Sequence, residues 1–208
     1  MKKLGVGIIL ILIVVAGYFL IKKYMPEVAK EDLMGDIAFP TGESSPTIDA
    51  SDLRMGGSSF SDPDGIYTFL YPNDYKIDPQ DPEKRTRIYK TGATQKGQTE
   101  IYDGVIIVFQ PVALEENESL SDWVDESIKT MTADGTSEVI EPKKAIMLNN
   151  YPGFSYMLRG LGTAQYYVLQ KDTESDYAVV ITTSVSDPED VGFQAEVDKT
   201  LSTIEILK

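Results

Sequence analysis

The sequence predicts an α+β domain in which helices pack on an antiparallel β-sheet. Three observations indicate this class: several segments alternate apolar and polar residues with period two, two segments carry apolar residues at helical spacing, and the turns between strands are short. Short turns favour antiparallel neighbours, because parallel strands need long crossover connections. The 42% hydrophobic and 25% charged residues are close to globular averages, so the chain can bury a core.

The predicted strands share a period-two alternation or a short apolar run bounded by turn residues. They are expected at residues 66–71, 105–109, 154–158, 164–171, 177–185 and 203–207. The run 164–171 is apolar on both faces and is therefore expected at the centre of the sheet. Clusters of Asn, Asp, Gly and Pro separate the strands that follow residue 150, which predicts an antiparallel meander.

The first predicted helix begins after Ser119, a favourable N-cap residue, with Asp122 three positions later. Its apolar stripe consists of Leu120, Trp123, Val124, Ile128 and Met131. The second helix is expected to begin at Asp187 as its cap, with Pro188 in the first helical position. Its buried stripe is expected to be Phe193, Val197 and Leu201.

The first residues of the chain predict a membrane anchor. The uncharged apolar run 4–21 lies between two lysine pairs and would form a helix of roughly 27 Å, close to the thickness of a bilayer's hydrocarbon core. Residues 1–3 are then a cytoplasmic tail, and the slight positive bias places the remaining chain outside the cytoplasm. The alternative is a cleaved signal peptide, for which Val14 and Ala16 offer a weak cleavage site.

Residues 22–59 are predicted to be a flexible acidic tether, since they are rich in Pro, Gly, Ser and Thr and lack periodicity. The globular domain is expected at 60–208. The chain has 33 acidic and 19 basic residues, a formal net charge of −14, and this charge disfavours nucleic acid as a partner.

The composition also limits the chemistry. The sequence contains no Cys and no His, so thiolate nucleophiles, disulfides, Cys/His zinc sites and histidine-based triads cannot be built from it. We expect no cofactor and no catalytic residue.

The segment SDPDG, with Asp62, Asp64 and Gly65, raises the question of a calcium site. An EF-hand loop needs oxygen ligands at alternating positions and a bidentate Glu at the twelfth. Ile66 stands at the third ligand position and Asn73 at the twelfth, so the pattern fails. The segment instead predicts a turn that leads into a strand, and we expect no metal site.

Two other groups of residues are candidates for a site. Acidic residues precede both helices and can act as paired carboxylates, although they more commonly stabilise helix N-termini. Tyrosines that could line a recognition surface are Tyr71, Tyr75, Tyr151, Tyr166 and Tyr167. The alternative is that these tyrosines are half-buried strand residues, as their β-propensity predicts.

The start of the domain carries a family resemblance. Phe60, Gly65, the strand 66–71 and the following residues 72–76 resemble the "G-Y-x-F-x-Y-P-x-x-W/Y" opening of PsbP-like domains, with Tyr75 where Trp is more usual. The helix containing Leu120 and Trp123 and the ending 197–204 are similar to that family as well. The resemblance implies an α-β-α sandwich that serves as a binding or accessory module near a membrane, with no shared catalytic residues.

We therefore expect a single-pass membrane protein that presents a non-catalytic accessory or binding domain to another envelope protein. Two alternatives stay open. One is a carboxylate-dependent hydrolase acting on envelope glycans, and the other is a carrier of a small ligand or a cation.

Overall fold

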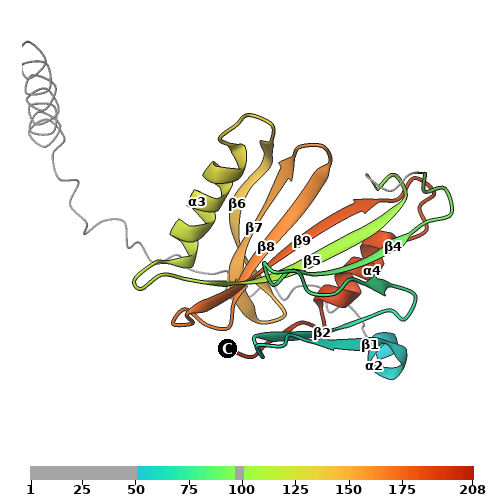
Figure 1. The fold of residues 1–208 in the computed structure, drawn as a ribbon, viewed down its shortest axis with the longest axis horizontal. Helices are drawn as coiled ribbons and strands as arrows, with labels where there is room; N and C mark the ends of the chain where they lie inside the picture. Colours follow the sequence, from blue (N-terminus) through green and yellow to red (C-terminus); the bar gives the residue numbers. More distant parts are fainter. Residues whose placement is uncertain (1–50, 97–100) are drawn as a thin grey trace, which may run out of the picture. The chain divides into compact units, whose positions relative to one another are not determined.

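The computed structural model of the chain describes residues 51–96 and 101–208 (Figure 1). The predicted anchor, 4–21, and most of the predicted tether lie outside these residues. Within the described part, no helix is long and apolar enough to cross a membrane.

The described residues form three helices and ten strands. The helices are α2 (Ser51–Gly56), α3 (Leu120–Thr132) and α4 (Phe193–Leu201). The strands are β1 (Ser58–Ser61), β2 (Tyr67–Tyr71), β3 (Lys76–Ile77), β4 (Thr86–Thr91), β5 (Gly104–Ala113), β6 (Glu138–Leu148), β7 (Tyr151–Arg159), β8 (Thr163–Gln170), β9 (Tyr177–Ser186) and β10 (Glu205–Ile206).

Two antiparallel sheets contain these strands. A small sheet has the order β1-β2-β10, and a large sheet has the order β3-β4-β5-β9-β8-β7-β6. Every pairing is antiparallel, and β6 to β9 follow one another as a meander. The predicted α+β class with an antiparallel sheet is confirmed.

The large sheet lies between two layers. One face carries Val105, Ile107 and Ile181, which pack in one core cluster with α4 and the small sheet. The other face carries Phe154, Tyr156 and other apolar side chains that pack against α3. Figure 1 shows α3 beside β6 and β7, and α4 close to β4 and β5. Helices therefore cover both faces of the large sheet, as in the α-β-α arrangement.

Stacked aromatic rings join the two sheets. The rings of Phe69 on β2 and Phe109 on β5 have centroids 4.0 Å apart and planes 12° apart. Tyr67 also stacks on Phe109, at 5.8 Å, and its hydroxyl donates to the Thr86 hydroxyl of β4. Aromatic pairs contribute beyond their buried area, so this contact fixes where the small sheet lies on the large one.

Three strands of the large sheet were not predicted: the two-residue β3, β4 and β6. The sequence of β6 contains Pro142, Lys143 and Lys144, and its pairing with β7 shifts register twice. Such residues suit an edge strand, where charge, proline and bulges prevent pairing with other chains. They also hide the alternation on which strand prediction depends.

The folded part begins earlier than the predicted boundary at Phe60. Residues 51–59, assigned to the tether from their composition, form α2 and the first half of β1. Leu53 is 6% exposed, and Ser58 pairs with Tyr71 of β2. The Ser-rich β1 has little apolar alternation of its own, because β2 supplies the aromatic face of this sheet.

The predicted start is confirmed for α3 and is wrong for α4. Ser119 caps α3 as expected: its hydroxyl accepts from the backbone N–H of Asp122 at 3.1 Å. The predicted start of α4 is wrong, since the helix begins at Phe193 after Gly192, whose φ is +96°. The buried stripe of α4 agrees with the prediction, because Phe193, Val197 and Leu201 are all buried.

The SDPDG segment is a turn. Asp62 is only 4% exposed, and its carboxylate accepts from the backbone N–H groups of Asp64 and Ile66, both at 3.1 Å. Gly65 adopts φ +65°, a conformation that glycine enters without strain. The oxygens that a calcium ion would need are thus used to form the entry to β2.

We predict that Phe69→Ala lowers the free energy of unfolding by about 3 to 5 kcal/mol, because it removes a fully buried ring. The control is Leu161→Ala, since the Leu161 side chain at the β7–β8 turn is 99% exposed, and it should change stability by less than about 0.5 kcal/mol. Urea unfolding followed by the fluorescence of Trp123 measures both. A loss below about 1 kcal/mol for Phe69→Ala would contradict the role given to the stacked rings.

Candidate functional site

The five candidate tyrosines do not form one surface. Tyr71 and Tyr75 are buried in the core between the two sheets, at 9% and 6% exposure, and Tyr151 packs against the same core. Tyr166 and Tyr167 are adjacent on β8 and point to opposite faces of the sheet. Tyr166 stacks on Tyr156 at 4.8 Å, on the α3 side.

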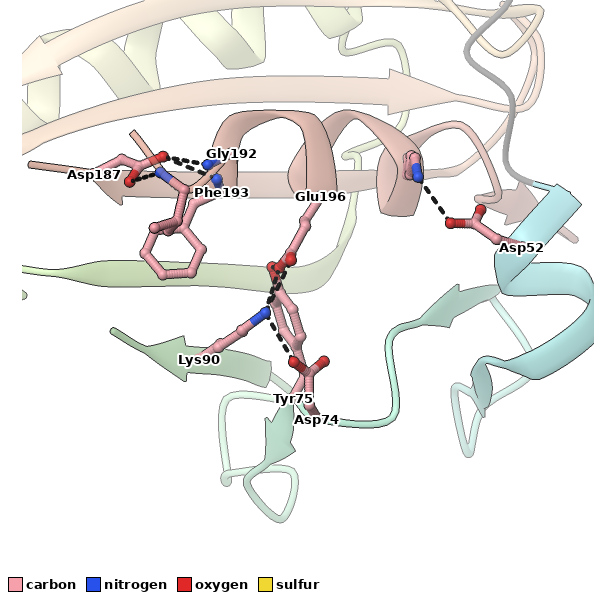
Figure 2. Close-up of polar contacts among 10 residues, drawn as sticks. Asp52, Asp74, Tyr75, Lys90, Asp187, Gly192, Phe193 and Glu196 are labelled. Carbon is pink, nitrogen blue, oxygen red and sulfur yellow. Dashed lines mark hydrogen bonds and ion pairs between the residues drawn. The ribbon is translucent and has the colours of Figure 1, made fainter. Parts of the chain in front are cut away.

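A polar network connects α4 to the sheets (Figure 2). The Lys90 ammonium of β4 lies 2.9 Å from Glu196 Oε1 on α4 and 2.8 Å from Asp74 Oδ2. The Tyr75 hydroxyl donates to Glu196 Oε2 at 3.0 Å. The same ammonium lies 5.8 Å from the centre of the Tyr75 ring and 5.6 Å from that of Phe193. These contacts join three segments that are distant in the sequence.

The electrostatics of this network favour a structural role. Burial, and then the charge of Glu196, raise the pKa of Tyr75, so its hydroxyl remains a donor. Burial alone would lower the pKa of Lys90, but hydrogen bonds to Asp74 and Glu196 outweigh it and raise that pKa. The raised pKa values keep Tyr75 neutral and Lys90 charged near neutral pH, and the carboxylates of Asp74 and Glu196 share the one ammonium. The network therefore holds α4 in place.

Asp187 anchors the start of α4, although it lies outside the helix (Figure 2). Its carboxylate accepts from the backbone N–H groups of Val191, Gly192 and Phe193 at 2.8, 2.8 and 3.0 Å. The N-cap of α4 is Gly192 and not the predicted Asp187, although Asp187 binds the backbone at the start of the helix. Partial burial pushes the pKa of Asp187 upward, but the three N–H groups outweigh it and hold that pKa below its usual value.

The acidic residues near the helix starts do not gather in a metal site. In residues 51–96 and 101–208, no group of three acidic side chains could hold a metal ion. Before α3, Glu115 and Glu116 are exposed, and Glu118 accepts a hydrogen bond from the backbone of Glu115.

The first candidate binding site is a groove of about 460 Å³ on the outward side of the small sheet. It is lined by Arg54, Thr68, Phe69, Leu70, Asn149, Ser202, Thr203 and Glu205, which come from α2, β2, the β6–β7 turn and the end of the chain. Asn149 has φ +51° and its amide donates to the carbonyl of Ile204, which fixes the turn against β10.

The second candidate is the part of the large sheet that faces away from α4, over β4 and β5. We call it the open sheet face, and its side chains are Lys76, Arg87, Tyr89, Ile106, Val108 and Thr182. The helix on this side, α3, packs mainly on β6 and β7. Tyr89 is the centre of the face, because Lys76 and Arg87 lie 5.9 and 5.4 Å from its ring centroid.

The sequence analysis missed both candidates. Tyr89 and Arg87 could have been found from the alternation of β4, in which Thr86 and Ile88 are buried and Arg87 and Tyr89 are not. The groove had no such signal, since its lining comes together only after α2 and β10 pack on β2.

Comparisons with known proteins do not identify a family for this chain. No protein-family model matches it, and no curated protein matches it. It is similar to the solved structure of cyanobacterial PsbP (CyanoP) from Synechocystis, at 14% identity and a TM-score of 0.46, covering 80% of this chain and 99% of that one.

The chain is also similar to the Ran-binding protein Mog1p of Saccharomyces cerevisiae, at 9% identity and a TM-score of 0.46, covering 74% of this chain and 96% of that one. A mutant of Mog1 gives the same identity, TM-score and coverage of this chain, with 97% of that chain covered. These likenesses are too distant to assign an activity or a partner.

We predict that the Lys90–Glu196 pair couples more strongly than an exposed pair. A double-mutant cycle with Lys90→Met and Glu196→Gln should give a coupling energy of about 1 kcal/mol, because both groups are partly screened from water. The matched control is the exposed pair Lys129 and Glu126 on α3, for which about 0.3 kcal/mol is expected. Equal coupling in the two cycles would show that the network does not anchor α4.

We predict that the contribution of Asp187 to stability depends on pH. Its pKa is lower in the folded chain than the ordinary value of 3.8, so its contribution is present above pH 4 and disappears as the pH falls through the folded pKa. Asp187→Asn should therefore lower Tm at pH 7 and have a much smaller effect at pH 2. The control is Glu189→Gln, an exposed residue of the same turn that should leave Tm nearly unchanged. A Tm difference that stays constant with pH would contradict the assignment.

Proposed function

We propose that the chain is a membrane-anchored, non-catalytic binding module that attaches to another envelope protein outside the cytoplasm through the open sheet face. The observation that carries the proposal is the side of the large sheet over β4 and β5, where α3 does not mainly pack and Tyr89 lies beside Lys76 and Arg87, with half-buried Ile106 and Val108 on the neighbouring strand.

The residue types of this face suit protein recognition. Tyrosine and arginine are enriched among residues that dominate binding energy at protein interfaces, and Tyr89 and Arg87 stand side by side here. Ile106 and Val108 supply an apolar surface from β5, and their β-branched side chains lose little rotamer entropy on binding. A flat sheet surface of this kind can be covered by a partner without any rearrangement of the fold.

The membrane part of the proposal rests on the sequence. The apolar run 4–21 between lysine pairs supplies the anchor, and the weak positive bias at the start supports an extracytoplasmic domain. The resemblance of residues 60–76 to the opening of PsbP-like domains points to the same accessory role.

The geometry gives less support to a glycan hydrolase and to a cation carrier. A glycan hydrolase needs two carboxylates about 5 to 10 Å apart in one cleft. The lining of the groove contains one carboxylate, Glu205, whereas Asp74 and Glu196 share the Lys90 cation. A cation carrier needs several converging oxygens, and the described residues offer no such cluster.

Site-specific photocrosslinking in intact membranes tests the proposal. A photoreactive amino acid at position 89 or 108 should give the same crosslinked envelope protein, because both positions lie on the open sheet face. The control position is 129, since the side chain of Lys129 on α3 is 74% exposed and lies outside that face.

The variant Tyr89→Ser should reduce recovery of the same partner at least tenfold while leaving urea unfolding nearly unchanged, because Tyr89 is not part of either core cluster. Crosslinking that is equally strong from position 129, or absent from positions 89 and 108, would contradict the proposed use of this face.

A further inference from the structure

The groove on the small sheet has the dimensions of a ligand site. Its volume of about 460 Å³ is within the range of about 300 to 1,000 Å³ that small-molecule pockets occupy. Outward-facing Thr68 and Leu70 of β2 form its floor, and it lies on the opposite side of the core from the open sheet face. A ligand here would therefore not compete with a protein bound to β4 and β5.

Most polar groups of the groove are already satisfied by the fold. The Thr203 hydroxyl accepts from the backbone N–H of Leu70 at 2.9 Å. The Thr68 hydroxyl donates to the carbonyl of Phe60 at 2.5 Å, and the Ser202 hydroxyl donates to that of Lys199 at 2.7 Å. These groups shape the groove but have little hydrogen-bonding capacity left for a ligand.

Two charged side chains in the lining, one positive and one negative, are not paired in this way. Arg54 on α2 and Glu205 on β10 line the same groove, yet among the described residues neither forms an ion pair. In contrast, the neighbouring Lys199 forms an ion pair with Asp52 at 2.8 Å. The groove thus contains a guanidinium and a carboxylate that form no ion pair with each other or with another described residue.

We propose that this groove binds a small zwitterionic molecule, with its anionic group on Arg54 and its ammonium group on Glu205. A guanidinium binds a carboxylate or a phosphate through two parallel hydrogen bonds, and a carboxylate accepts from an ammonium. Leu70, which lines the same groove, would contact the aliphatic part of the ligand. Peptides with free termini and ethanolamine phosphate headgroups share this chemistry.

The test is a titration of the isotope-labelled full chain, solubilised in detergent and followed by amide NMR. Dialanine and phosphoethanolamine are the two zwitterionic probes, and N-acetyl-dialanine amide, which has no charge, is the control ligand. We expect saturable shifts at the amides of Leu70 and Thr203 with a Kd below about 1 mM for at least one zwitterion. Binding of dialanine alone supports a peptide source, and binding of phosphoethanolamine alone supports a headgroup source.

Variants distinguish binding in the groove from non-specific effects of the ligands on the protein. Arg54→Gln and Glu205→Gln should each weaken binding at least tenfold, and the double exchange Arg54→Glu with Glu205→Arg should recover part of it, because a zwitterion can bind in the reversed orientation. Tyr89→Ser should leave this binding unchanged, so failure of the proposed protein interface remains distinguishable. Both groove residues are exposed, and unchanged amide shifts elsewhere verify folding. The proposal is wrong if neither zwitterion binds, or if the uncharged control binds equally well.

Discussion

The stacking of Phe69 on Phe109 joins the two sheets through their buried aromatic side chains. It fixes the small sheet on the large one, with ring centroids 4.0 Å apart, and thereby places β1 and β10 at the sides of β2. Because Tyr67 and Phe69 point inward, Thr68 and Leu70 must point outward and become the floor of the groove. The alternation of side chains along β2 thus determines which residues enter the core and which line the groove.

Two lysines attach the helices in a similar manner. Lys90 joins α4 to β4 through Glu196, and Lys143 of β6 joins α3 through Asp125 and the Ser121 hydroxyl, at 2.6 and 2.8 Å. Each ammonium also lies over an aromatic ring, Phe193 or Phe154. Since α3 is held over β6 and β7, it does not extend over the β4 side of the same face.

The sequence correctly predicted those elements whose position is determined by a local pattern of residues. The alternation of Val105, Ile107 and Phe109 identified a strand and its buried face, and Ser119 identified the start of α3. It failed where contacts beyond the local pattern decide: β6 is an edge strand whose lysines interrupt the alternation, and Asp187 accepts from the Phe193 N–H across a turn, so that α4 begins later than predicted. Arg54 and Glu205 lie near opposite ends of the described chain, so no spacing rule could have placed them in one groove.

We propose that the open sheet face is covered by a partner protein in the cell. Hydroxyl-radical footprinting, applied to intact membranes and to the purified chain, tests it most directly, because side-chain oxidation reports solvent access at single residues. We expect Tyr89, Ile106 and Val108 to be protected in membranes and oxidised after purification, whereas the exposed Leu161 should be oxidised equally in both. Equal oxidation of Tyr89 in the two samples would show that no partner covers this face.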